Sequence, residues 1–123
     1  MNVVDSSGWL EYFANGRNAD FFAPSIETPA ELIVSTISIL EVFKCVLREK
    51  GEREALSAVG LMTSGQVAVL DMAVALRAAK VGVDLKLPLA DSVMLATARQ
   101  FSATLWTQDA DFRKIDGVKY CRK

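Results

Sequence analysis

The sequence contains no histidine, and this absence excludes several kinds of active site. Without histidine there is no Ser-His-Asp triad, no acid–base pair built on imidazole and no His-ligated zinc. The only two cysteines, Cys45 and Cys121, fit no metal-binding or redox spacing, so we expect reduced thiols in a cytoplasmic protein. Any catalysis must therefore depend on carboxylates, hydroxyls, lysines or bound metal ions.

The sequence also lacks an excess of charge and a long apolar run. A formal net charge of −1 predicts no broad electropositive face, which argues against nucleic-acid binding by charge alone. It does not argue against an enzyme that meets phosphates through metal ions. We recognise no signal peptide and no apolar stretch of membrane-spanning length, and expect no membrane partner. With 123 residues, 51% of them apolar and 24% charged, the chain is expected to form one globular domain.

Short apolar runs alternate with helical segments along the chain. Strands are expected at residues 2–4, 32–34, 67–70, 104–106 and 118–121. Helices are expected at about 8–14, 18–26, 36–50, 52–62, 72–81 and from Pro88 through 98, with a helical turn at 112–114. This alternation predicts an α/β fold with a parallel sheet, strand order 3-2-1-4-5, and helices on both faces.

The stretch LPLADSVMLATARQFSATLWTQDADF, residues 87–112, is the most informative part of the sequence. Asp91 is the only charged residue between 89 and 98, and a helix this apolar is normally buried. An acid inside such a helix is costly unless it is paired, hydrogen-bonded or metal-bound. Asp109 follows the next strand closely. The stretch therefore delivers two acids to the ends of a helix and a strand, where α/β folds place their chemistry.

Two further acids are expected at the same edge of the sheet. Asp5 ends the first strand, and Glu41 lies on the helix after the second. Singly, Asp5 could cap a helix and Glu41 could pair with Lys44 on a solvated face. Together with Asp91 and Asp109 they converge near strands one and four, where four carboxylates would repel one another without cations. Oxygen ligands without His or Cys favour Mg²⁺ or Mn²⁺, which would bind substrate phosphate and activate water.

Neighbouring polar side chains are expected to support these acids. The hydroxyls of Ser6 and Thr107 are candidates for orienting the carboxylates beside them. Asp111 points to the same edge, where it either acts through water or caps the turn at 112–114. Asp71 also follows a strand, but a strand expected at the edge of the sheet, so we interpret it as a helix cap only.

Four segments, NVVDSSGWLEYF, STISILEVFK, LPLADSVMLATA and WTQDADF, resemble the PIN-domain family, and within it the VapC-type toxins of toxin–antitoxin pairs. The resemblance implies a three-layer α/β/α sandwich formed by a single PIN-like domain over residues 1–123, with a divalent-metal site and ribonuclease activity. The family's catalytic, metal-binding quartet corresponds to the four acids already named, and its hydroxyls correspond to Ser6 and Thr107. Gly8 departs from the larger apolar residue that is frequent in the family, which could loosen the first helix.

The leading hypothesis is an Mg²⁺- or Mn²⁺-dependent endoribonuclease held inactive by a VapB-like antitoxin. One alternative is a catalytically idle module that binds RNA or protein, which an incomplete acid set would have favoured. Another is an unrelated acidic-site phosphohydrolase, such as an aspartyl-phosphate phosphatase. That chemistry needs a D-x-D pattern on the first strand, whereas Asp5 is followed by two serines.

The first two predicted helices carry more aromatic surface than one small sheet face obviously needs. Core packing explains any one of these side chains, but as a set they could line a groove with the Glu41 helix, open to an amphipathic segment. The resemblance implies that this segment is an antitoxin tail whose basic side chain reaches the acids. It also implies a homodimer through helices on the side of the fourth strand. The candidate partner-binding residues are Trp9, Leu10, Phe13, Phe21 and Phe22.

Overall fold

Five short strands form one fully parallel sheet at the centre of the protein. The computed structural model describes all 123 residues, and the strand order is β3-β2-β1-β4-β5. The order, the parallel pairing and the α/β class are as predicted from the sequence. The strands are β1 (Asn2–Val4), β2 (Leu32–Ser35), β3 (Gln66–Ala68), β4 (Thr104–Thr107) and β5 (Val118–Tyr120).

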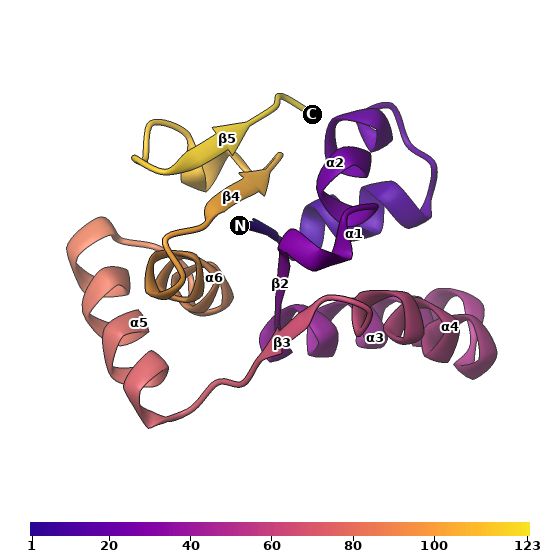
Figure 1. Ribbon diagram of the computed structural model, residues 1–123, viewed down its shortest axis with the longest axis horizontal. Helices are drawn as coiled ribbons and strands as arrows, with labels where there is room; N and C mark the ends of the chain where they lie inside the picture. Colours follow the sequence, from indigo (N-terminus) through magenta and orange to yellow (C-terminus); the bar gives the residue numbers. More distant parts are fainter.

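Six α-helices cover the two faces of the sheet and complete three layers. Figure 1 shows α5 and α6 on one side of the strands and α1 to α4 on the other. None of the helices is both long and apolar enough to span a membrane. The helices are α1 (Ser6–Phe13), α2 (Ala19–Ile26), α3 (Thr36–Lys50), α4 (Glu52–Met62), α5 (Met72–Leu85) and α6 (Leu89–Gln100), with two 3₁₀ turns, η1 (Pro29–Glu31) and η2 (Ala110–Phe112).

The hydrophobic core is divided in two by the sheet, because successive residues of a strand point to opposite faces. Val4 packs with α1 to α4, whereas its neighbour Val3 packs with α6. The helix α6 lies between the sheet and α5, so its residues from Ser92 to Ala98 are all buried. The apolar helix predicted around Asp91 is therefore a core helix, and Asp91 enters the active-site region from its first turn.

The start of α1 differs from the expectation. Asp5, and not Ser6 or Ser7, caps this helix, because its carboxylate accepts a hydrogen bond from the backbone N–H of Gly8. Gly8 does not loosen the helix. A β-carbon there would lie 2.6–2.7 Å from atoms of Phe22 and Val4, so the missing side chain lets α1 pack closely on both.

Other boundaries differ by a few residues. The helix α5 continues past the predicted end at Val81, because Gly82 allows a close approach of Ser92 on α6 and does not break the helix. The strand β3 ends at Ala68, two residues earlier than predicted. Asp71 caps α5 as predicted, through the backbone N–H of Val74.

Candidate active site

The pairing of β1 with β4 brings two of the predicted acids to one edge of the sheet. Val4 and Trp106 are register partners, and the backbone N–H of Asp5 donates to the carbonyl of Trp106 at 3.1 Å. Asp5 directly follows β1, and Asp109 lies two residues after the end of β4. Because both strands run in the same direction, both side chains are placed at the carboxyl edge of the sheet.

The Asp5 carboxylate is buried and held by three hydrogen bonds. Its Oδ1 accepts from Ser7 Oγ at 2.8 Å and from Gly8 N at 2.9 Å, and its Oδ2 accepts from Thr107 Oγ1 at 2.5 Å. Burial nevertheless raises the pKa of Asp5, because its exposed fraction is only 2%. A carboxylate has about four lone-pair positions, so three hydrogen bonds leave Asp5 about one for a further ligand.

Two hydroxyl groups connect elements across the site. Thr107 Oγ1 donates to Asp5 and accepts from the backbone N–H of Asp109 at 2.9 Å, so one side chain positions both acids. Ser6 Oγ donates to Glu41 Oε1 at 2.6 Å. Ser6 was expected to orient the acid beside it, but its partner is Glu41 on α3.

The closest group of carboxylates contains Asp91, Asp109 and Asp111. One oxygen from each of these three residues lies within 4.8 Å of the others. Asp5 and Glu41 lie outside this group. The expectation that Asp111 caps a turn at 112–114 is wrong. The turn is η2, over Ala110–Phe112, and Asp109 caps it by accepting a hydrogen bond from the backbone N–H of Asp111 at 2.9 Å.

The two features that sequence reasoning missed are the central place of Asp111 and the hydrogen bond from Ser7 to Asp5. The D-x-D spacing of Asp109 and Asp111, folded into one 3₁₀ turn, was the available signal for the first. The signal for the hydrogen bond from Ser7 to Asp5 was their separation by two residues, which is typical of local side-chain hydrogen bonds.

The pKa of Asp91 shows that the five acids lie close enough to influence one another. Burial, and after it the negative charges of the other four acids, together raise the pKa of Asp91 to about 7. From the largest effect on this pKa to the smallest, these acids are Asp109, Asp5, Asp111 and Glu41. Near neutral pH, Asp91 is thus about half protonated in the protein without a cation.

The donor set fits a hard divalent cation. Five carboxylates surround the site, and the chain has no histidine to offer nitrogen ligands. Oxygen ligands of this kind suit Mg²⁺ or Mn²⁺, and a cation would offset the repulsion that raises the pKa of Asp91. The residues able to hold it are Asp91, Asp109 and Asp111, with the remaining lone pair of Asp5 and the carboxylate of Glu41.

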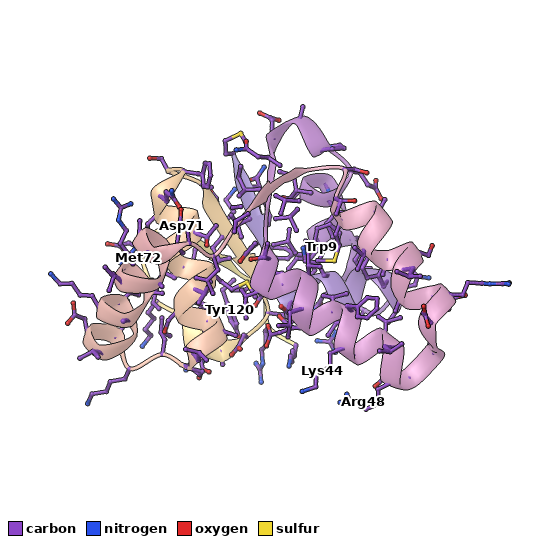
Figure 2. The ribbon with its side chains drawn as sticks, turned by 90° about the horizontal axis from the view of Figure 1, so that it is seen from below. Trp9, Lys44, Arg48, Asp71, Met72 and Tyr120 are labelled. Carbon is purple, nitrogen blue, oxygen red and sulfur yellow. The ribbon has the colours of Figure 1, made fainter.

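The predicted partner-binding residues divide into two sets. Trp9 and Phe22 are fully buried in the core between the sheet and α1 to α4, so the expectation that they line an open groove is wrong. Trp9 lies among the interior side chains in Figure 2. Phe21 packs on the ring of Trp106, at 5.1 Å between centroids.

Leu10 and Phe13 do line a groove, which has a volume of about 880 Å³ between α1, α3 and α4. Apolar side chains such as Leu61 form part of its wall, and Ser7 and Gln108 also line it. Ser7 donates a hydrogen bond to Asp5, and Gln108 precedes Asp109 in the chain. The groove therefore includes two residues that adjoin Asp5 and Asp109, although none of the five site carboxylates lines it.

Comparisons with known proteins agree with the fold. The chain is similar to a toxin–antitoxin complex protein from Klebsiella pneumoniae, with 23% identity over 97% of this chain and 96% of that chain and a TM-score of 0.81. It is similar to the sarcin-ricin loop cleaving toxin VapC20 of Mycobacterium tuberculosis, with 19% identity, coverage of 91% and 92%, and a TM-score of 0.73. A third similar structure is DNA-bound VapBC from Salmonella typhimurium, with 13% identity, coverage of 99% and 97%, and a TM-score of 0.75.

At these identities the solved structures establish the fold. No curated protein matches the sequence. The PIN domain family model matches residues 3–118, which is nearly the whole chain. The chain therefore belongs to the PIN domain family.

Proposed function

We propose that this protein is an Mg²⁺- or Mn²⁺-dependent endoribonuclease, the VapC-type toxin of a toxin–antitoxin pair. The observation that carries the proposal is the convergence of five carboxylates at one edge of the sheet, with the pKa of Asp91 raised to about 7. Membership of the PIN domain family and the similarity to VapC20 support the same function. The acid set is complete, which disfavours an idle binding module.

In the proposed mechanism the side chains hold and orient the reacting groups. Asp91, Asp109 and Asp111 would bind the cation, and Asp5, fixed by Thr107, would offer its remaining lone pair. The bound ion would supply neutralisation of the phosphate charge and activation of the attacking water. Glu41 faces the same place and is oriented by Ser6, so it can position a water or a substrate hydroxyl.

The function is tested with total RNA and with a small phosphomonoester, each with and without Mn²⁺. We expect RNA cleavage that requires Mn²⁺, no phosphatase activity, and complete loss of cleavage in EDTA. Asp91→Asn should abolish cleavage with an unchanged circular dichroism spectrum. It should also reduce the rise in melting temperature that Mn²⁺ causes in the unsubstituted protein.

Two results would contradict the proposal. Cleavage that persists in EDTA or in Asp91→Asn would place the chemistry elsewhere. RNA binding without cleavage under every metal condition would favour the idle module.

The groove between α1, α3 and α4 is the proposed antitoxin site. Its apolar wall suits the apolar face of a helix, and its charged lining has more acids than bases. A basic side chain on the bound segment, extending past Ser7 and Gln108, would be attracted toward the site carboxylates. Such a residue would offset the carboxylates' repulsion and compete with the metal, so binding and inhibition become one event. The charged lining residues are Glu11, Glu49, Glu54, Lys50 and Lys123.

We also propose a homodimer, through the surface of α5, which packs on α6, the helix that precedes β4. Exposed apolar side chains concentrate on α5 and on the segment that connects β3 to α5. An exposed apolar patch on a small protein marks an interaction surface. The residues are Val69, Leu70, Met72, Leu76 and Val83.

A further inference from the structure

One side of α3 carries an acid of the site followed by two cations. Glu41, Lys44 and Arg48 are separated by three and four residues, a spacing that places side chains on one side of a helix. The hydrogen bond from Ser6 holds Glu41 at the site. Lys44 and Arg48 lie about 4.5 Å and about 10.5 Å farther along the helix axis than Glu41. On this side of α3 the charge thus changes from negative to positive with distance from the site.

This side of α3 is free of the core and of the groove. Ser38 and Val42 point into the core, and Val46 and Glu49 line the groove. Figure 2 shows Lys44 and Arg48 projecting from the same margin of the molecule. Both side chains are exposed, and the contact of Arg48 Nη2 with Cys45 Sγ at 4.0 Å uses only one of its five N–H groups.

A nucleic-acid strand needs local cations to approach this site. The five carboxylates repel phosphate, and a net charge of −1 provides no general attraction. Ammonium and guanidinium groups bind phosphate oxygens through charge-assisted hydrogen bonds. Lys44 and Arg48 are one helical turn apart, about 6 Å, a step comparable with the separation of adjacent phosphates in an extended strand.

We propose that Lys44 and Arg48 bind consecutive phosphates of single-stranded RNA, on one side of the phosphodiester that is cut at the carboxylates. The proposal rests on the proposed ribonuclease function and adds the path of the substrate. It makes α3 the element that sets the direction of the strand. Because the contacts are to phosphates, they position the RNA without reading its bases.

The test measures how binding depends on salt. In an Asp91→Asn background with Mn²⁺, a fluorescent mixed-sequence single-stranded RNA of about 16 nucleotides is titrated by anisotropy at several salt concentrations. Each phosphate contact contributes about −0.7 to the slope of log K against log salt. The pair Lys44→Gln and Arg48→Gln should therefore make the slope shallower by about 1.4, whereas Lys44→Arg should leave it unchanged.

The matched control is Lys80→Gln with Arg77→Gln, which removes the same two residue types from exposed positions on α5. We expect no change of slope for this pair. Equal changes of slope for both pairs would show that only the net charge of the protein matters. A change for the α5 pair alone would place the RNA over α5 and α6. Either result overturns the proposal. So does an Asp91→Asn protein that binds no RNA.

RNA cleavage by the unsubstituted chain separates this inference from the proposed function. If the chain cleaves RNA with Mn²⁺ but the variant with Lys44→Gln and Arg48→Gln shows the same salt dependence of binding as its parent, only the inference fails. If the chain cleaves no RNA, both fail.

Discussion

At the scale of single residues, Asp91 is an acid whose ionisation the folded protein disfavours. Burial and the negative charges of four nearby acids together raise its pKa from 3.8 to about 7. The folded protein therefore binds this proton more tightly than the unfolded chain does. The stabilisation from this group is complete below about pH 4 and is lost as the pH rises through about 7.

This linkage predicts that Asp91 makes the metal-free protein less stable at high pH. In EDTA, the melting temperature of the unsubstituted protein should fall more between about pH 5 and about pH 8 than that of Asp91→Asn, because Asn cannot ionise. Mn²⁺ should raise the melting temperature more at about pH 8 than at about pH 6, since the ion and the proton compete for one carboxylate. Equal pH profiles for the two proteins would contradict the assignment of the raised pKa to Asp91.

The sequence predicted the position of each acid better than the contacts between them. Asp5 and Asp109 could be placed because each closely follows an apolar strand, and parallel strands end at one edge. The closeness of Asp91 to Asp111 could not be predicted, because it depends on the 3₁₀ turn and on side-chain rotamers. For the same reason Ser6 was assigned to the wrong acid: its partner, Glu41, is distant in the sequence and close only in the folded protein.

At the scale of elements, α1 contributes to both the core and the groove. Trp9 is fully buried and stacks on Phe13 at 5.7 Å between ring centroids, whereas Leu10 and Phe13 face the groove. The sequence could not separate these side chains, because Trp9, Leu10 and Phe13 are all large apolar residues within one short helix. The separation follows from Gly8, whose missing side chain brings α1 onto Phe22 and fixes which side of the helix is inside.

The two sets of residues should respond differently to substitution. Trp9→Ala should lower the free energy of unfolding by about 3–5 kcal/mol, because it leaves a large cavity in the core. Leu61→Asp, on the exposed wall of the groove, should change it by less than about 1 kcal/mol in urea denaturation. It should nevertheless abolish co-purification with the proposed antitoxin, since it places a charge against an apolar helix face.

Several results would contradict this division. They are a stable Trp9→Ala protein, a Leu61→Asp protein that keeps its antitoxin, and the absence of any adjoining antitoxin gene.

At the scale of the whole molecule, alternating strands and helices were sufficient to predict the sheet. The right-handed crossovers of βαβ units leave few strand orders, and the observed order is one of them. What the alternation could not predict is which helix faces remain uncovered. Val74 and Ala78 of α5 are buried against α6, while Met72 and Val83 are 78% and 80% exposed, a difference that only the packing of α5 determines.

The uncovered face of α5 predicts that two copies associate there. Figure 1 places α5 at the outer margin of the molecule, and Met72, Leu76 and Val83 recur on one side of it at spacings of four and seven residues. An isologous contact would bury each stripe against the other. Leu76→Glu with Val83→Glu should therefore convert a dimer into a folded monomer in light scattering coupled to gel filtration. Leu47→Glu, an exposed apolar position on α3, should leave the dimer intact. A parent protein that is monomeric at all concentrations, or a double variant that remains dimeric, would show that this face of α5 does not hold the two copies together.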